Sequence, residues 1–190
     1  MSTPDGSQDW VAAGFEALAA GGVDRVRVEV LAQSLGVTKG GFYRRFRDRP
    51  ALLEAMLETW AAGRIAVIRQ QTELGDDETP DARLRSVVQL FSERRNAQGL
   101  SIEIAIRQWA RSDPGAAAAV SRVDAVRLAS VTELYARMGH DPATAQARGF
   151  IFYAFVFGQT LLLPEASQAE RDALVTASAD IIAGSTGAAK

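Results

Sequence analysis

Cysteine is absent from this 190-residue sequence, and histidine occurs once, at position 140. Without cysteine the chain can form neither disulfide bonds nor thiolate-based zinc and redox sites. A single histidine leaves little scope for a metal centre or a catalytic triad, both of which usually use histidine. The sequence also lacks a phosphate-binding loop and a nucleophile placed beside a base. We therefore expect no metal, no cofactor and no catalytic residue, which argues against a helical enzyme.

Long hydrophobic runs are missing too. The longest, from Phe150 to Leu163, is too short to span a bilayer and is typical of a buried helix. The first residues, MSTPDGSQD, are polar and acidic, whereas a secretory signal begins with basic and then apolar residues. These features predict a cytoplasmic protein with no membrane partner.

Alternating strand patterns are nearly absent, and apolar residues instead recur at helical spacing. The sequence therefore predicts an all-α fold of about nine helices. The expected helices cover residues 8–20, 28–35, 38–46, 48–71, 80–96, 100–111, 114–138, 142–163 and 168–183.

Helix boundaries and one linker organise the chain. Thr79, Asp113 and Asp141 each precede a proline, as capping residues do at a helix start, and Ser167 with Glu170 form a capping-box pattern. The acidic segment LGDDETP at 74–80 is the clearest break in composition. We predict an N-terminal domain of residues 5–65, which the long fourth helix joins to a C-terminal helical bundle of residues 75–184.

Charge is distributed unevenly along the chain. The net charge is −2, yet the window 25–49 holds seven basic and two acidic side chains, a net +5, so the remainder carries −7. A small basic region attached to an acidic body is typical of a protein that binds nucleic acid through one part.

The basic window contains a helix-turn-helix pattern at about 27–46, with its turn at Gly36. On the second helix, Phe42 and Phe46 share a face that can dock on the other helices, as the helical repeat of 100° per residue requires. The opposite face suits DNA because it offers basic and hydroxyl groups for phosphates and guanine edges, and glycines for close backbone approach. This face and its flanks hold Thr38 as the helix cap, Lys39, Gly40, Gly41, Tyr43, Arg44, Arg45, Arg47 and Arg49.

The stretch LAQSLGVTKGGFYRRFRDRPALLEAML closely resembles the DNA-binding domain of TetR-family transcriptional regulators. The resemblance is specific over about residues 8–63 and less diagnostic beyond. It implies an all-helical homodimer, a palindromic operator, repression by default, and a pocket for a small-molecule effector in the C-terminal body.

Mapped onto matching positions, the resemblance implies DNA contacts by Thr38, Lys39, Gly41, Tyr43 and Arg49. The sequence departs from the family pattern at three basic residues, Arg27, Arg45 and Arg49, where Thr or Ser, His and Lys are usual. All three add or keep positive charge, and Arg27 loses a cap but can clamp a phosphate.

Aromatic residues concentrate in the body, where they can line a ligand pocket or fill the core. Our candidate pocket residues are Trp60, Phe91, Trp109 and Tyr153, with Arg107 or Gln108 as a polar anchor.

The helix at 142–163 is apolar nearly all round between Phe150 and Phe157, so it must be covered on every side. A symmetric partner can cover it, as a four-helix bundle formed with the last helix; the alternative is a monomer core helix. The predicted dimer-interface residues are Phe150, Ala154, Phe157, Leu161, Leu174, Ala177 and Ile181.

A rival function is a ligand-binding or protein-interaction dimer that no longer reads a DNA sequence. The intact basic face argues against it. A comparison of operator and scrambled DNA distinguishes the two.

Overall fold

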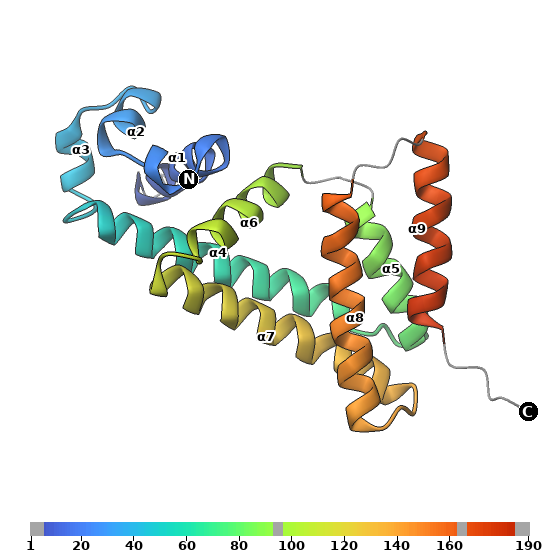
Figure 1. Ribbon diagram of the computed structural model, residues 1–190. Coiled ribbons are helices and arrows are strands. Elements are labelled where there is room, and N and C mark those ends of the chain that lie inside the picture. Colours follow the sequence, from blue (N-terminus) through green and yellow to red (C-terminus); the bar gives the residue numbers. More distant parts are fainter. Residues whose placement is uncertain (1–5, 93–96, 163–166, 185–190) are drawn as a thin grey trace, which may run out of the picture. The chain divides into compact units, whose positions relative to one another are not determined.

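The protein is described by a computed structural model that covers residues 6–92, 97–162 and 167–184. Side chains at positions 6–8, 91, 92, 97, 160 and 161 lie outside the described part. Within these ranges the chain forms nine α-helices, one 3₁₀ turn and no strand, which confirms the predicted all-α class (Figure 1). The elements are α1 (Gly6–Gly21), η1 (Val23–Arg25), α2 (Val28–Ser34), α3 (Lys39–Tyr43), α4 (Arg49–Thr72), α5 (Pro80–Ser92), α6 (Ala97–Trp109), α7 (Pro114–Arg137), α8 (Pro142–Leu161) and α9 (Gln168–Ala183).

The chain divides into two compact units. The first combines residues 1–64 with 96–123, and the second combines 65–95 with 124–190. Helices α4 and α7 each contribute residues to both units. The domain boundaries at 5–65 and 75–184 stay a prediction about independent folding, and α6 lies in the unit that contains the N-terminal helices.

The core of the first unit is built from α1, α2, α3, α4 and α6. Leu18, Leu31, Phe42 and Leu52 are fully or almost fully buried there. Gly14 is buried opposite Met56, and a Cβ built on it would lie 2.6 Å from the Met56 sulfur. Such packing anchors the short helices α2 and α3, which are too short to be stable alone.

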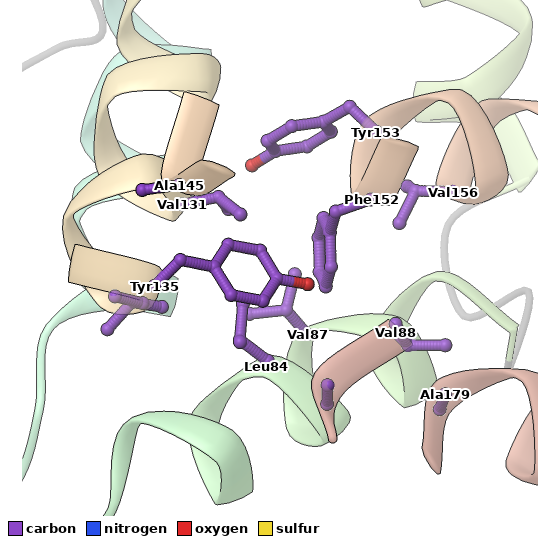
Figure 2. Packing of buried hydrophobic residues seen from close by; sticks show 12 residues of the cluster. Leu84, Val87, Val88, Val131, Tyr135, Ala145, Phe152, Tyr153, Val156 and Ala179 are labelled. Atoms are coloured by element: carbon purple, nitrogen blue, oxygen red, sulfur yellow. The ribbon is translucent and has the colours of Figure 1, made fainter. Parts of the chain in front are cut away.

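The second unit has its own hydrophobic core, shown in Figure 2. Tyr135 and Phe152 lie close together there, with Leu84 and Val87 of α5 beside them and Tyr153 above. The Tyr135 hydroxyl donates a 2.8 Å hydrogen bond to the backbone carbonyl of Ile182, near the end of α9. Burial raises the pKa of this hydroxyl to about 12, an effect that the nearby Arg148 partly offsets.

Several predicted helix starts are confirmed by side-chain caps, whereas the predicted helix ends at 96 and 163 lie outside the described residues. Backbone amides near the start of the next helix donate hydrogen bonds to Asp48, Asp113 and Asp141. Ser167 and Glu170 form both hydrogen bonds of the capping box, and the pKa of Glu170 lies below its ordinary value chiefly because Ser167 donates to its carboxylate.

The helix-turn-helix differs from the prediction in three details. The turn η1 was not expected. The expected helix at 38–46 ends at Tyr43, and the amide of Arg45 donates to the carbonyl of Phe42 three residues before it, as in a 3₁₀ turn. Thr38 begins α3 as predicted, but its side chain makes no capping hydrogen bond.

Two glycines terminate helices as the sequence predicted. Gly22 follows α1 with φ of 79°, and Gly36 forms the turn after α2 with φ of 66°. Both values lie in the left-handed region that glycine adopts without a Cβ clash. None of the described helices is long and apolar enough to cross a bilayer.

Candidate nucleic-acid interface

The second helix of the helix-turn-helix is held in place by one aromatic anchor. Phe42 is fully buried, and its ring lies 5.2 Å from that of Trp10 and 5.6 Å from that of Phe46. Edge-to-face and stacked rings at these separations stabilise the docking of α3 on α1. Because Phe42 faces inward, the other side of α3 faces solvent.

The outward side of α3 carries the basic and hydroxyl groups that the sequence predicted. Tyr43 exposes 61% of its surface, far more than a tyrosine in a core. Lys39, Gly40, Arg44 and Arg45 are exposed as well, and Gly41 is half-buried, with an added Cβ 3.9 Å from the Trp10 ring. This surface is polar and positively charged, and a helix is an element that a major groove of DNA admits.

Lys39 forms an ion pair with an acidic side chain of α2. Its Nζ donates a 2.8 Å hydrogen bond to Oε1 of Glu29 on α2. The Lys39 hydrogen bond is the largest cause that holds the pKa of Glu29 below its ordinary value. Sequence reasoning missed Glu29, although helical spacing places this carboxylate on the outer face at the start of α2.

Two other residues predicted to contact DNA, Arg27 and Arg49, donate hydrogen bonds to backbone carbonyls of the protein. Arg27 donates from Nε to the carbonyl of Asp24 at 3.2 Å. Arg49 donates from Nε to the carbonyl of Val26 at 2.6 Å and from Nη2 to that of Val23 at 2.7 Å. Arg49 therefore ties the start of α4 to the segment before α2, a role that the sequence did not indicate.

The sequence profile of the family described as "Bacterial regulatory proteins, tetR family" matches residues 11–56. This range contains α2, α3 and the basic surface described above. Over residues 11–56 the chain therefore resembles the DNA-binding segment of the tetR family.

Solved structures support the TetR fold over almost the whole chain. A TetR-family transcriptional regulator from Rhodococcus sp. aligns with TM-score 0.72 and 20% identity, covering 94% of this chain and 98% of its own. The reduced form of NemR from E. coli gives 0.73 and 17%, covering 94% and 97%. A tetR-family regulatory protein from Rhodococcus RHA1 gives 0.68 and 18%, covering 99% and 100%. At these identities the likeness concerns the fold alone. A search of curated proteins found no match to this sequence.

The predicted pocket residues fall in both compact units. Trp60 and Trp109 are buried in the first unit, and Tyr153 is buried in the core of the second. The side chain of Phe91 lies outside the described residues. The Trp60 indole N–H is buried and has no acceptor within the described part of the chain.

An open groove of about 710 Å³ occurs within the first unit. Its walls come from the end of α1, the turn η1 and α6, and they include Trp109 together with Arg107 and Gln108, the two predicted polar anchors. Near it, the buried carboxylate of Glu103 accepts hydrogen bonds from Arg64 at 3.1 Å and Arg107 at 2.8 Å. Among the described residues, no group of three or more histidine or acidic side chains could hold a metal ion.

The predicted dimer residues on α8 and α9 are largely exposed in the single chain. Phe150 and Ile181 expose 67% and 80% of their surface. Leu174, Ala154 and Ala177 are exposed too, whereas the side chain of Leu161 lies outside the described residues. Phe157 is half-buried, with the Arg127 guanidinium 5.1 Å from its ring centre.

Proposed function

We propose that this protein is a TetR-family regulator, a ligand-responsive repressor that binds a palindromic operator as a homodimer. The observation that carries the proposal is the exposed Lys39–Tyr43–Arg44 surface of α3, fixed from behind by the fully buried Phe42. A rigid basic helix lowers the entropic cost of ordering side chains against a base-pair edge. A protein that acts on chromosomal DNA in this way works in the cytoplasm.

The proposed contacts divide into two kinds. Lys39 and Tyr43 lie on the exposed side of α3, Arg44 directly follows that helix, and all three are suited to bases or to the phosphates that flank them. The flanking residues Arg27 and Arg49 have donors engaged by backbone carbonyls, so their contribution is to position the motif as well as to add charge. The full proposed set is Arg27, Thr38, Lys39, Gly40, Gly41, Tyr43, Arg44, Arg45 and Arg49.

The homodimer is proposed to form through α8 and α9. Large apolar side chains such as Phe150, Leu174 and Ile181 rarely remain together on a monomer surface, and a second copy can cover them with the same face. Exposed alanines at 154 and 177 permit close approach of the helices. Two recognition helices in one dimer then address two half-sites of a palindrome.

An effector is proposed to bind in the body and to change operator affinity. Trp60 lies on α4, outside residues 75–184, but it remains a candidate because its buried indole N–H has no acceptor within the described chain and such a donor is normally satisfied by a partner. Trp109 and Tyr153 remain further candidates, with residues 75–184 as the proposed ligand-binding and dimerisation domain. Coupling between effector and operator typically changes affinity by about 1–3 kcal/mol.

Fluorescence anisotropy tests the proposed DNA reading. The purified protein is titrated onto a duplex from directly upstream of its own gene and onto a scrambled duplex of equal length. We expect a preference of about 10³-fold or more for the native duplex. Lys39→Ala and Tyr43→Ala should each remove much of the preference. Arg69→Ala, which removes an exposed positive charge from α4, should preserve it.

If the upstream duplex shows no preference, selection from random DNA locates the operator. Failure of the selection to enrich any sequence, together with steep and equal salt dependence on all duplexes, contradicts the operator proposal. It favours instead a regulator-like dimer whose body binds ligands or proteins while its basic face no longer reads sequence.

A further inference from the structure

The ion pair between Glu29 and Lys39 lies on the exposed surface of the helix-turn-helix. Glu29 is in the first turn of α2 and Lys39 is the first residue of α3, so the pair bridges the two helices of the motif. Their side chains remain 61% and 58% exposed, respectively, at an Nζ–Oε1 distance of 2.8 Å. The contact therefore occurs on the surface that the proposed function assigns to DNA.

Stabilisation of the fold does not explain this pair. Exposed ion pairs contribute little to stability because solvent screens them and two long side chains lose freedom. The motif is already held by buried apolar residues, among them Leu31 and Phe42. We therefore consider the effect of the Glu29–Lys39 pair on DNA binding.

Glu29 differs in one respect from Asp48, the other acidic residue of the window 25–49. The Asp48 carboxylate accepts the amide of Ala51 at the start of α4 and contacts its neighbour Arg47. Glu29 instead contacts a residue of α3 itself. Of these two acidic residues, Glu29 is therefore the one that affects the orientation of Lys39 on the recognition helix α3.

An ammonium group has three donors, and one of those on Lys39 points to Glu29. The remaining two can still reach a base edge or a phosphate, from a side chain whose orientation is already set. The carboxylate meanwhile neutralises the charge that attracts phosphates of any sequence. Binding without sequence preference depends almost entirely on that attraction, whereas operator binding also uses directed hydrogen bonds.

We propose that Glu29 is a specificity-determining positioning residue, which orients Lys39 and weakens sequence-independent DNA binding more than operator binding. The inference rests on the proposed operator function, and it adds an acidic residue to a surface otherwise described by its basic ones. Glu29 acts through Lys39 rather than by touching a base.

The test compares Glu29→Gln with the wild-type protein on two probes, a random-sequence duplex and the best duplex from selection out of random DNA. We expect Glu29→Gln to bind the random duplex about fivefold more tightly, the order expected when one unit charge is lost close to a phosphate. The slope of log affinity against log salt concentration on that duplex should become steeper. The change corresponds to about one more phosphate neutralised per protomer, or about 0.9 in the slope. Affinity for the selected duplex should rise less, so the specificity ratio falls.

Two controls separate positioning from bulk charge. Glu16→Gln removes the same charge from an exposed site on α1 and should leave the specificity ratio unchanged. In a Lys39→Ala background, Glu29→Gln should no longer lower the ratio, because the residue that it orients is gone. Thermal unfolding that matches the wild type shows that each variant folds.

Equal tightening on both duplexes contradicts the proposal and reduces Glu29 to a source of general repulsion. Unchanged affinity for both duplexes in Glu29→Gln overturns it as well. A wild-type protein that prefers no duplex at all is a different result, since it refutes the operator function on which the inference rests.

Discussion

The Nε of Arg49 donates a 2.6 Å hydrogen bond to the backbone carbonyl of Val26, across 23 residues of sequence. The same guanidinium also donates to the carbonyl of Val23 at 2.7 Å. Val23 is the first residue of the turn η1 and Val26 follows its last, and this turn leads from α1 towards α2. Arg49 thereby fixes the entry of the helix-turn-helix against the first residue of α4.

Arg49→Ala is expected to lower the free energy of unfolding by about 1.5–3 kcal/mol, the range for a hydrogen bond that involves a charged group. The substitution leaves two partly buried carbonyl groups without their donor. Arg49→Lys should recover only part of this, since an ammonium cannot reproduce a planar, two-pronged donor. Urea unfolding measures the change. Arg47→Ala is the control, because its side chain is 82% exposed and forms its ion pair with the adjacent residue Asp48. Unfolding of Arg49→Ala that equals the wild type, with weaker DNA binding, would indicate that Arg49 serves DNA contact alone.

Glu103 leads to a second prediction, because its carboxylate is buried and accepts from both Arg64 and Arg107. When either arginine is replaced, the other still pairs with Glu103. When both are replaced, the buried carboxylate loses two guanidinium partners, and removing the partners of a buried charge is strongly destabilising. We expect each single alanine variant to cost about 1.5 kcal/mol and the double variant clearly more than their sum. Additive losses in urea unfolding would show that the carboxylate is not shared. Arg122→Ala, in an exposed pair with Glu58, should cost about 0.5 kcal/mol or less.

The contrast between Phe42 and Glu103 shows how far the sequence could take the prediction. Helical spacing placed Phe42 inward and Tyr43 outward, and the structure confirms both, because a local repeat fixes which face a residue occupies. Capping at Asp141 was predictable for the same reason, since its hydrogen bonds span only three residues.

Contacts between distant segments were not predictable in this way. The Arg64–Glu103 pair joins residues 39 apart, and Arg49 reaches carbonyls that every residue possesses, so neither leaves a pattern in the sequence. The grouping of 96–123 with the N-terminal helices depends likewise on tertiary packing of α6. Only the spacing of Glu103 and Arg107, one helical turn apart, offered a local signal that we did not use.

A third prediction concerns pH. Burial raises the pKa of Tyr135 to about 12, from an ordinary value of 10.0 for a tyrosine exposed to solvent. Above pH 10 the unfolded chain therefore loses this proton before the folded chain does, so stability present at lower pH falls as pH rises from 10 to 12. Tyr135→Phe should lose about 1 kcal/mol at neutral pH, through the missing hydrogen bond to Ile182, and should show a smaller alkaline loss than the wild type. Tyr43→Phe, at an exposed position, is the control in urea unfolding across this pH range. Identical alkaline loss in all three proteins would contradict the assignment to Tyr135.

The last prediction concerns the exposed apolar face of α8 and α9. Phe150→Asp combined with Ile181→Asp places charges where the proposed dimer buries two large apolar side chains, and burying unpaired charge is costly. Because both positions are exposed in the single chain, the variant should keep its helical circular-dichroism spectrum while sedimenting as a monomer. Operator affinity should fall steeply, since one recognition helix binds a half-site without its partner. Val67→Asp, at an exposed apolar site on α4, should remain dimeric. A double-aspartate variant that stays dimeric and binds the operator normally would place the interface on another surface.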